Sequence, residues 1–505
     1  MKKLLILFIL AACIMSCEDD SFSTSPSNVL SFSSDTIHFD TLFSDVPSPT
    51  KTFWAYNKNK QGLRCTSVRL DKGNQSGFRV NVRGVYLGPE NGYSTNNVEI
   101  WKHDSIRVFI EATLPLNYKN QPTEVSDNLI FTLENGKEQK VNLTAFSWDA
   151  QRLRDVIITE NASWQASEKP RVIYGSLTIE KDATLTLKAG SVLYFHGDAS
   201  LEVKGRLLCE GTPEANVILR GDRLDKMFDY LPYDQVSGQW KGVHFDETSY
   251  DNVLSYTDIH SAFDGIQIDS SDVSRNKLTL QHSVVHNCQG YGVKSIQSNV
   301  SINNSQITNT LADCIFVDGG TMAINQSTIA QFYPFDANRG VALRASSVNH
   351  KLLSFSCMNS IITGYAQDEM MMEFDKEATN DERNFSFDYC LLRTPPVETK
   401  DSVKFQNIIY ESLEVNANSG EKNFKLVDAD KQRYNFELSE LSKAVGLANP
   451  QTALPYDRLG NKRDEAPDAG CYELIKSEND KTEEMNNTSH KNKWPYKKIK
   501  QPNKK

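Results

Sequence analysis

Two histidines occupy equivalent positions in neighbouring sequence repeats. His260 and His286 each directly follow the same aliphatic position of a short strand-like pattern, and Asp258 and Asp264 lie close to the first of them. Imidazole and carboxylate groups that meet on adjacent strands can transfer protons or hold a metal ion. His260, His286 and Asp264 are therefore the candidate catalytic residues.

Further titratable residues are expected in the same cluster, but the set that lyase chemistry needs is incomplete. His282 is close in the chain, and His244 and Asp246 are expected on the preceding repeat. Polysaccharide lyases combine carboxylates that bind Ca²⁺ with an Arg or Lys base, and no such set repeats here. Histidines stacked on an exposed face are also common without any chemistry. The sequence favours a passive or binding surface, and it predicts no metal site and no cofactor.

A long aromatic stretch interrupts the repeats between Asp222 and Ser237. Long loops inside regular folds are usually functional or packed. One interpretation is a lid that folds over a flank of the repeats or over a domain junction. The other is a platform for a sugar ring, because aromatic faces bind apolar ring surfaces. The candidate binding residues are Phe228, Tyr230, Tyr233 and Trp240.

The element that must position these residues is a repeat of 22 residues. Leu280, Ile302 and Ile324 each begin the pattern apolar-x-x-Ser-x-apolar, at intervals of 22. A fixed period in this range indicates a solenoid, and short alternating apolar runs indicate strands. The serine column, Ser283, Ser305 and Ser327, is expected to stack at one corner. Looser copies extend the pattern, and we predict a parallel β-helix over residues 155–420.

The N-terminal part has a different pattern. About seven short strands are expected over residues 30–150, which predicts an Ig-like β-sandwich. The dipeptide Asn135-Gly136 predicts a hairpin with a type I′ turn. No catalytic constellation is visible in this region, and we interpret it as a spacer.

Composition excludes some classes of partner. The chain has 505 residues, a net charge of −10 and a pI near 5.5, and its expected folded part carries no basic stripe. Nucleic acid is therefore not an expected partner.

The nine cysteines are scattered singly, and Cys288, Cys314, Cys357 and Cys390 fall on strand positions, where we expect small buried hydrophobes. Residues 476–505 form a Lys-rich tail that we expect to be disordered.

The N-terminus predicts export and lipidation. Lys2 and Lys3 precede an apolar core, as in a secretory signal peptide. The residues that end at Cys17 resemble a bacterial lipobox, and those that end at Cys13 form a rival. We favour Cys17, and thus a signal peptide over 1–17, because the longer apolar core precedes it. Glu18-Asp19-Asp20 resembles the export signal of Bacteroidota surface lipoproteins, and residues 18–29 are expected to be a polar tether.

Two further resemblances concern the rest of the chain. Residues 155–394 resemble right-handed parallel β-helix proteins of bacterial surfaces, a likeness that is specific for the fold. The ending of residues 424–475 is similar to the choice-of-anchor Q family, on the motifs Asp457-x-x-Gly460-x-x-Arg463 and Asp468-x-Gly470-x-Tyr472-Glu473. It departs from the family at Cys471, where a small residue is usual. This segment is expected to cap the open end of the solenoid.

The fold class expected from the sequence is all-β: an Ig-like sandwich followed by a right-handed parallel β-helix. The resemblances imply a lipoprotein of the outer membrane, held by its N-terminal lipid and exposed at the cell surface. The favoured function is non-catalytic binding of a glycan, polysaccharide or protein. The alternative is a carbohydrate-active enzyme, a polysaccharide lyase or a glycoside hydrolase. Fold alone does not decide between them.

Overall fold

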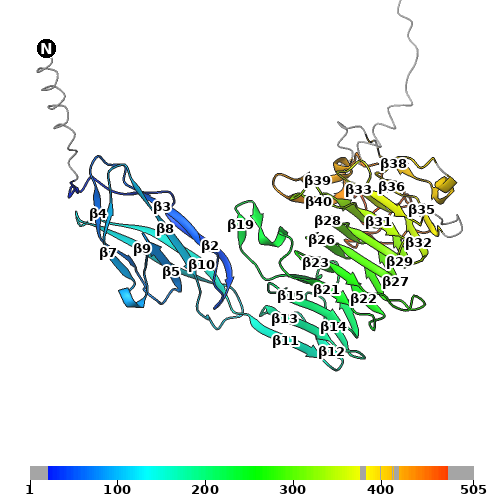
Figure 1. Ribbon diagram of the computed structural model, residues 1–505, viewed down its shortest axis with the longest axis horizontal. Coiled ribbons are helices and arrows are strands. Elements are labelled where there is room, and N and C mark those ends of the chain that lie inside the picture. Colours follow the sequence, from blue (N-terminus) through cyan, green and yellow to red (C-terminus); the bar gives the residue numbers. More distant parts are fainter. Residues whose placement is uncertain (1–20, 376–382, 399, 412, 414–419, 476–505) are drawn as a thin grey trace, which may run out of the picture.

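The computed structural model describes residues 21–375, 383–398, 400–411, 413 and 420–475. Within these residues the chain is all-β and forms two domains placed end to end, a β-sandwich and a right-handed parallel β-helix (Figure 1). The predicted fold class is thus confirmed. The segment predicted to be a signal peptide, with Cys13 and Cys17, and the Lys-rich tail lie outside the described residues. The described residues include no helix of the length and hydropathy that a membrane span requires.

The sandwich consists of two five-stranded sheets whose facing side chains form one core. In sheet order the first contains β1 (Ser31–Phe32), β3 (Lys51–Tyr56), β8 (Ser105–Ala112), β5 (Phe78–Val82) and β6 (Val85–Tyr86). The second contains β2 (Thr36–Phe43), β10 (Glu138–Trp148), β9 (Thr123–Leu133), β4 (Leu63–Leu70) and β7 (Ser94–Ile100). Buried and partly exposed residues alternate along strands such as β5, as expected where one face of a sheet packs on the core.

Two local details of the sandwich differ from expectation. The hairpin of β9 and β10 is present, but only Gly136 has a positive φ, 81°, so the turn is not type I′. The amide of Leu133 donates to Lys137, which leaves a three-residue loop that ends in a left-handed glycine. The expected tether is also not free over its described part, because the ring of Phe22 packs 4.9 Å from that of Trp101.

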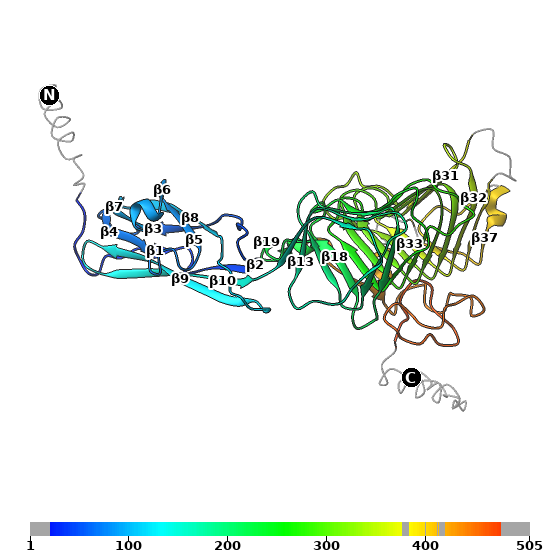
Figure 2. The same ribbon diagram turned by 90° about the horizontal axis from the view of Figure 1, so that it is seen from below.

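The second domain winds its strands into three parallel sheets (Figures 1 and 2). The first sheet contains the second halves of β11 (Gln151–Ile158) and β13 (Arg171–Ile179), then β16 (Ser200–Val203), β21 (Gly242–Phe245), β24 (Ile266–Ile268), the first halves of β27 (Val293–Asn303) and β29 (Ile315–Asn325), β31 (Leu343–Ser346) and β34 (Met370–Glu373). The second contains β12 (Ala162–Trp164), β14 (Thr184–Lys188), β17 (Arg206–Glu210), β22 (Asn252–Ser255), β25 (Leu278–Gln281), the second halves of β27 and β29, β32 (Leu352–Met358), β35 (Phe385–Asp388) and β37 (Phe405–Gln406).

The third sheet carries the candidate site. It contains the first halves of β11 and β13, then β15 (Val192–Phe195), β18 (Val217–Gly221), β23 (Thr257–His260), β26 (Val284–Cys288), β28 (Gln306–Thr310), β30 (Thr328–Gln331), β33 (Ile361–Gly364), β36 (Leu391–Leu392) and β38 (Ile409–Tyr410). Side chains alternate between the interior of the helix and its outward face along each strand. The outward face of this sheet is the surface on which the loop of residues 222–237 and the C-terminal segment lie.

The predicted register of the repeats is confirmed. Leu280 pairs with Ile302, and Ile302 pairs with Ile324, all in the buried core. The serine column stacks as expected, because the amide of Ser283 donates to Oγ of Ser305 at 3.1 Å and the amide of Ser305 donates to Oγ of Ser327 at 3.3 Å. These bonds satisfy backbone donors at a corner where the ladder is interrupted.

The cysteines of the β-helix are small core residues. Cys288, Cys314, Cys357 and Cys390 are buried in the interior cluster, as predicted. Burial raises the pKa of the Cys209 thiol to about 12. In the described part of the chain all cysteines are free, so aliphatic and sulfur packing, rather than disulfides, holds the coils together.

The C-terminal segment was predicted to cap the open end of the solenoid. It lies along the side of the solenoid instead. Residues 420–475, with η5 (Glu421–Asn423) and the hairpin of β39 (Phe424–Asp428) and β40 (Arg433–Leu438), lie along the third sheet (Figure 2, orange). Its contacts run from Leu391 back to Asn216, which accepts a 2.7 Å hydrogen bond from Arg458. The physical reason is the small and apolar outward side chains of this sheet, such as Ala330 and Ile361, which would otherwise face water.

The junction between the two domains is also packed. Phe43 of the sandwich meets Tyr194 of the β-helix edge-to-face, with ring centroids 5.3 Å apart, and Trp148 lies against the same tyrosine. Arg152 donates a hydrogen bond to the carbonyl of Ser44. The apolar contact and this bond join the two domains across the junction.

Candidate functional site

The candidate site lies on the outward face of β23 and β26. Ile259 and Val285 point into the core, so the alternation of the strands turns Asp258, His260 and His286 outward. His260 and His286 are paired in the parallel register, and their ring centroids are 4.9 Å apart. The stacking of the two histidines predicted from the repeats is therefore confirmed.

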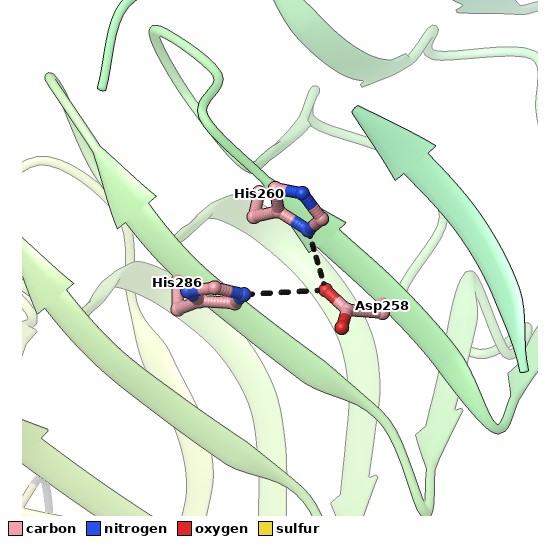
Figure 3. A group of neighbouring side chains, drawn as sticks. All are labelled: Asp258, His260 and His286. Atoms are coloured by element: carbon pink, nitrogen blue, oxygen red, sulfur yellow. Dashed lines mark hydrogen bonds and ion pairs between the residues drawn. The ribbon is translucent and has the colours of Figure 1, made fainter. Parts of the chain in front are cut away.

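Asp258 joins the two imidazoles (Figure 3). Its Oδ1 atom lies 2.8 Å from Nδ1 of His260 and 3.3 Å from Nε2 of His286. Asp258 and His286 remain partly open to solvent, with side chains 27% and 25% exposed, whereas His260 is 7% exposed. The three groups thus form one cluster with a buried side and an open side.

The buried side is closed by Asp234, which the sequence did not indicate. This residue belongs to η2 (Tyr233–Gln235) in the loop of residues 222–237, and its Oδ1 atom lies 2.8 Å from Nε2 of His260. Arg220 lies 2.8 Å from the same oxygen, and Ser261 donates to the carbonyl of Asp234. The loop therefore folds over the flank of the solenoid, as one of the two sequence interpretations proposed.

The two carboxylates decide the charge of His260. Burial opposes protonation of its ring, but Asp258 and Asp234 outweigh burial and raise the pKa of His260 to about 9. Burial also opposes ionisation of Asp258, yet His260 and His286 hold the pKa of Asp258 well below its usual range. At neutral pH both ring nitrogens of His260 therefore donate to carboxylates. Both ring nitrogens are thus engaged by carboxylates at 2.8 Å, and neither faces an open space from which it could take a proton.

The other residues named from the sequence lie elsewhere. Asp264, a catalytic candidate, occupies a corner, where it accepts the amide hydrogen of Tyr291 at 2.7 Å. His244 lies on the first sheet between Glu202 and Asp269, at 2.7 and 2.9 Å. His282 stacks on Tyr256 with centroids 4.6 Å apart. Nearness in the sequence therefore did not bring Asp264, His244 and His282 to the site, because a coil spreads its residues over three faces.

Trp240 is not a surface residue, so its assignment as a binding residue is corrected. Its side chain is 1% exposed and stacks on Phe195 in the core, with centroids 4.2 Å apart. Its Nε1 atom donates to the carbonyl of His260 at 2.9 Å. A large aromatic ring fills the interior where the coils resume after the loop.

The aromatic residues of the loop divide into two groups. Phe228 and Tyr230, on the hairpin of β19 (Lys226–Phe228) and β20 (Leu231–Pro232), are 54% and 45% exposed. Their rings are stacked, with centroids 5.7 Å and planes 12° apart. Tyr233 instead lies at the base of the loop, where the guanidinium of Arg223 covers its ring at 3.7 Å. The tip is therefore an exposed aromatic surface and the base is packed.

A cleft of about 360 Å³ lies beside this loop, at the junction of the domains. The lining residues are Thr41, Leu42, Phe43, Val46, Pro47, Ser48 and Pro49 of the sandwich and His196, Asp222, Arg223, Leu224, Asp225 and Tyr233 of the β-helix. A second hollow of about 310 Å³ shares Val46, Pro47 and His196 with it and adds Arg152, Arg154 and Tyr174. The hairpin of β19 stands beside this junction (Figure 1).

No protein-family model and no curated protein matches the sequence. Three solved structures are similar to parts of the chain, each with low overall similarity. A PapD-like domain of human CEP192 is 14% identical, with a TM-score of 0.17, over 27% of this chain and 97% of that one. A Porphyromonas gingivalis protein of unknown function is 11% identical, with a TM-score of 0.18, over 27% and 59%. A family 123 glycoside hydrolase from Clostridium perfringens is 10% identical, with a TM-score of 0.17, over 26% of each chain.

Proposed function

We propose that the protein is a non-catalytic module of the cell surface that binds a saccharide with the aromatic hairpin of β19 and β20. The observation that carries this proposal is the exposed, stacked pair of Phe228 and Tyr230. Neighbouring apolar rings that are exposed to water often mark a surface that contacts a ligand or a partner. The flat face of an aromatic ring suits the apolar face of a sugar, while its edge leaves room for hydroxyl groups.

The base of the loop is fixed, which favours binding. Arg223 forms two hydrogen bonds with Asp225, at 2.6 and 2.7 Å, and the amide of Tyr233 donates to the carbonyl of Asp225 at 3.0 Å. The hydroxyl of Ser237 lies 2.9 Å from that of Tyr333 on another coil. A platform on a fixed base loses little conformational entropy when it binds its ligand.

The junction cleft can extend the same binding surface. Its volume lies within the range of small-molecule sites, about 300–1,000 Å³. Arg223 adds hydrogen-bond donors to this cleft, and in the adjoining hollow Tyr174 packs on His196 with ring centroids 4.6 Å apart. A saccharide that lies across the hairpin and the cleft would contact both domains.

The cleft argues against the alternative of a carbohydrate-active enzyme. Glycosidases use two carboxylates that flank the bond they cleave. Here Asp222 lies 2.7 Å from Nδ1 of His196, and Asp225 is held by Arg223. Both carboxylates are thus held by basic side chains of the protein. Together with the blocked His260, this arrangement supports binding over catalysis.

Replacing either exposed ring should abolish most of the binding. In the variants Phe228→Ala and Tyr230→Ala we expect at least a tenfold loss of affinity, which is about 1.4 kcal/mol. The measurement is affinity electrophoresis or calorimetry against xylan, mannan, starch and a host mucin glycan preparation. The matched control is Trp54→Ala, which removes an exposed ring stacked on Tyr56 in the sandwich. Equal binding by all these variants would reject the platform, and cleavage of any of these glycans by the wild type would favour the enzyme.

The surface location rests on the sequence resemblance and has its own test. In cells fed labelled palmitate, Cys17→Ala should lose the label and leave the membrane fraction, because no other anchor is proposed. The control is Cys13→Ala, which should keep both. Label retained in the first variant and lost in the second would move the lipid to Cys13. Label retained in both would reject lipidation at either cysteine.

A further inference from the structure

We propose that Asp258, His260 and His286 bind one divalent transition-metal ion of the zinc type. One ligand atom of each residue lies within 4.8 Å of the others. Two imidazoles and one carboxylate are donors that Zn²⁺ accepts readily. Among the described residues, this is the one group of three or more histidine, cysteine or acidic side chains whose ligand atoms all lie within 4.8 Å of one another. The proposal does not depend on the saccharide-binding function.

The spacing of the ligand atoms suits a tetrahedral ion. Bonds of about 2.0–2.1 Å from Zn²⁺ to nitrogen and oxygen place neighbouring ligand atoms about 3.3 Å apart. The observed separations from Oδ1 of Asp258 are 2.8 Å to His260 and 3.3 Å to His286. The ligand nitrogens of the two histidines lie within 4.8 Å of each other. The rings must turn toward the ion to bind it, while β23 and β26 hold the backbone in register. The ion displaces the proton between Nδ1 of His260 and the carboxylate.

Asp234 supplies the outer partner that a metal-binding histidine needs. Histidine ligands usually donate their second ring N–H to a carboxylate, which fixes the tautomer and the ring orientation. Nε2 of His260 lies 2.8 Å from Oδ1 of Asp234, on the side opposite Asp258. Nδ1 is thereby directed at the proposed ion. Since Asp234 belongs to the loop of residues 222–237, the ion would also connect the coils to the base of that loop.

A second histidine between carboxylates shows why the cluster is distinctive. His244 contacts Glu202 through Nδ1 and Asp269 through Nε2. These two ring nitrogens point apart, so its two carboxylates cannot share one ion with the ring. In the proposed site the carboxylate of Asp258 instead lies between two rings (Figure 3). The partial exposure of Asp258 and His286 leaves the open side for entry of the ion and for a water as fourth ligand.

Metal content and cobalt spectroscopy test the proposal on the tag-free mature chain. After treatment with EDTA, dialysis against Zn²⁺ should restore about one ion per chain, measured by mass spectrometry. Co²⁺ should give the visible absorption of a tetrahedral site. Asp258→Asn and His286→Ala should each lose the spectrum and the tight ion. Asp234→Asn should keep the spectrum at saturation but bind about 10–100-fold more weakly. Circular dichroism verifies that each variant is folded.

The matched control is His244→Ala, which should bind like the wild type. The proposal is overturned if the wild type takes up no ion, or if Asp258→Asn and His286→Ala hold as much Zn²⁺ as the control. It is also overturned if His244→Ala loses the cobalt spectrum while His286→Ala keeps it. If His286→Ala fails to fold, Asp258→Asn and Asp234→Asn decide, because both substitutions preserve the shape of the side chain.

Discussion

Ile307→Asp should unfold the β-helix at a temperature on the order of 10 °C below that of the wild type. The side chain of Ile307 is fully buried between Val285 and Ile329 in the interior ladder. A carboxyl group there loses the apolar contacts and has no partner, at a cost of about 4 kcal/mol or more. Thermal denaturation followed by circular dichroism measures the effect.

The control for this variant is Ala323→Asp. Ala323 lies between the buried Met322 and Ile324, but its own side chain points outward and is exposed. We expect its melting temperature to stay within a few degrees of the wild type, since exposed substitutions cost about 0.5 kcal/mol or less. Similar losses in the two variants would contradict the assignment of inward and outward positions.

Arg463→Met should release the C-terminal segment from the third sheet. Arg463 and Glu473 form an ion pair of 2.8 Å, with side chains 2% and 4% exposed. The same guanidinium donates to Asn304 on the solenoid at 2.9 Å. Without it, the carboxylate of Glu473 is buried with no opposite charge, which costs about 3–5 kcal/mol. Limited proteolysis should then cleave within residues 424–475 under conditions in which the wild type stays intact.

Two further variants test the cause. Replacing Glu473 by Gln in the Arg463→Met background should restore part of the protection, because the isolated charge is gone. Lys425→Met breaks an exposed pair with Glu437 and should change stability by at most about 0.5 kcal/mol. If Arg463→Met resists the protease as the wild type does, the buried pair does not hold the segment in place.

The sequence predicted the parts of the fold that repeat. The register of Leu280, Ile302 and Ile324 could be identified because one aliphatic residue per coil must fill the same interior position. The stacking of His260 and His286 could be predicted in the same way, because each follows an equivalent interior position on the next strand of its coil. A periodic pattern carries this information without any knowledge of distant contacts.

The features that the sequence did not predict depend on segments outside the repeat. Asp234 reaches His260 because a loop folds back over the flank, and no period marks that contact. Trp240 was named as a binding residue, but its ring stacks on Phe195 in the core, where the interior has room for it. The C-terminal segment was wrongly predicted to lie at the end of the solenoid. Its contact with the outward face near Ile361 depends on tertiary packing, which the local sequence does not show.

The path of the C-terminal segment bears on how the solenoid folds. A chain of stacked coils, each contacting only its neighbours, frays from its ends, and its stability grows coil by coil. This segment links Asn216, Asn304 and Asn359, which belong to coils far apart along the axis. Opening any one of these coils must therefore disturb the others, which makes melting more cooperative. Because these linking residues follow all the coils in the sequence, the outward face of the third sheet stays uncovered in any folding intermediate in which residues 420–475 have not yet docked.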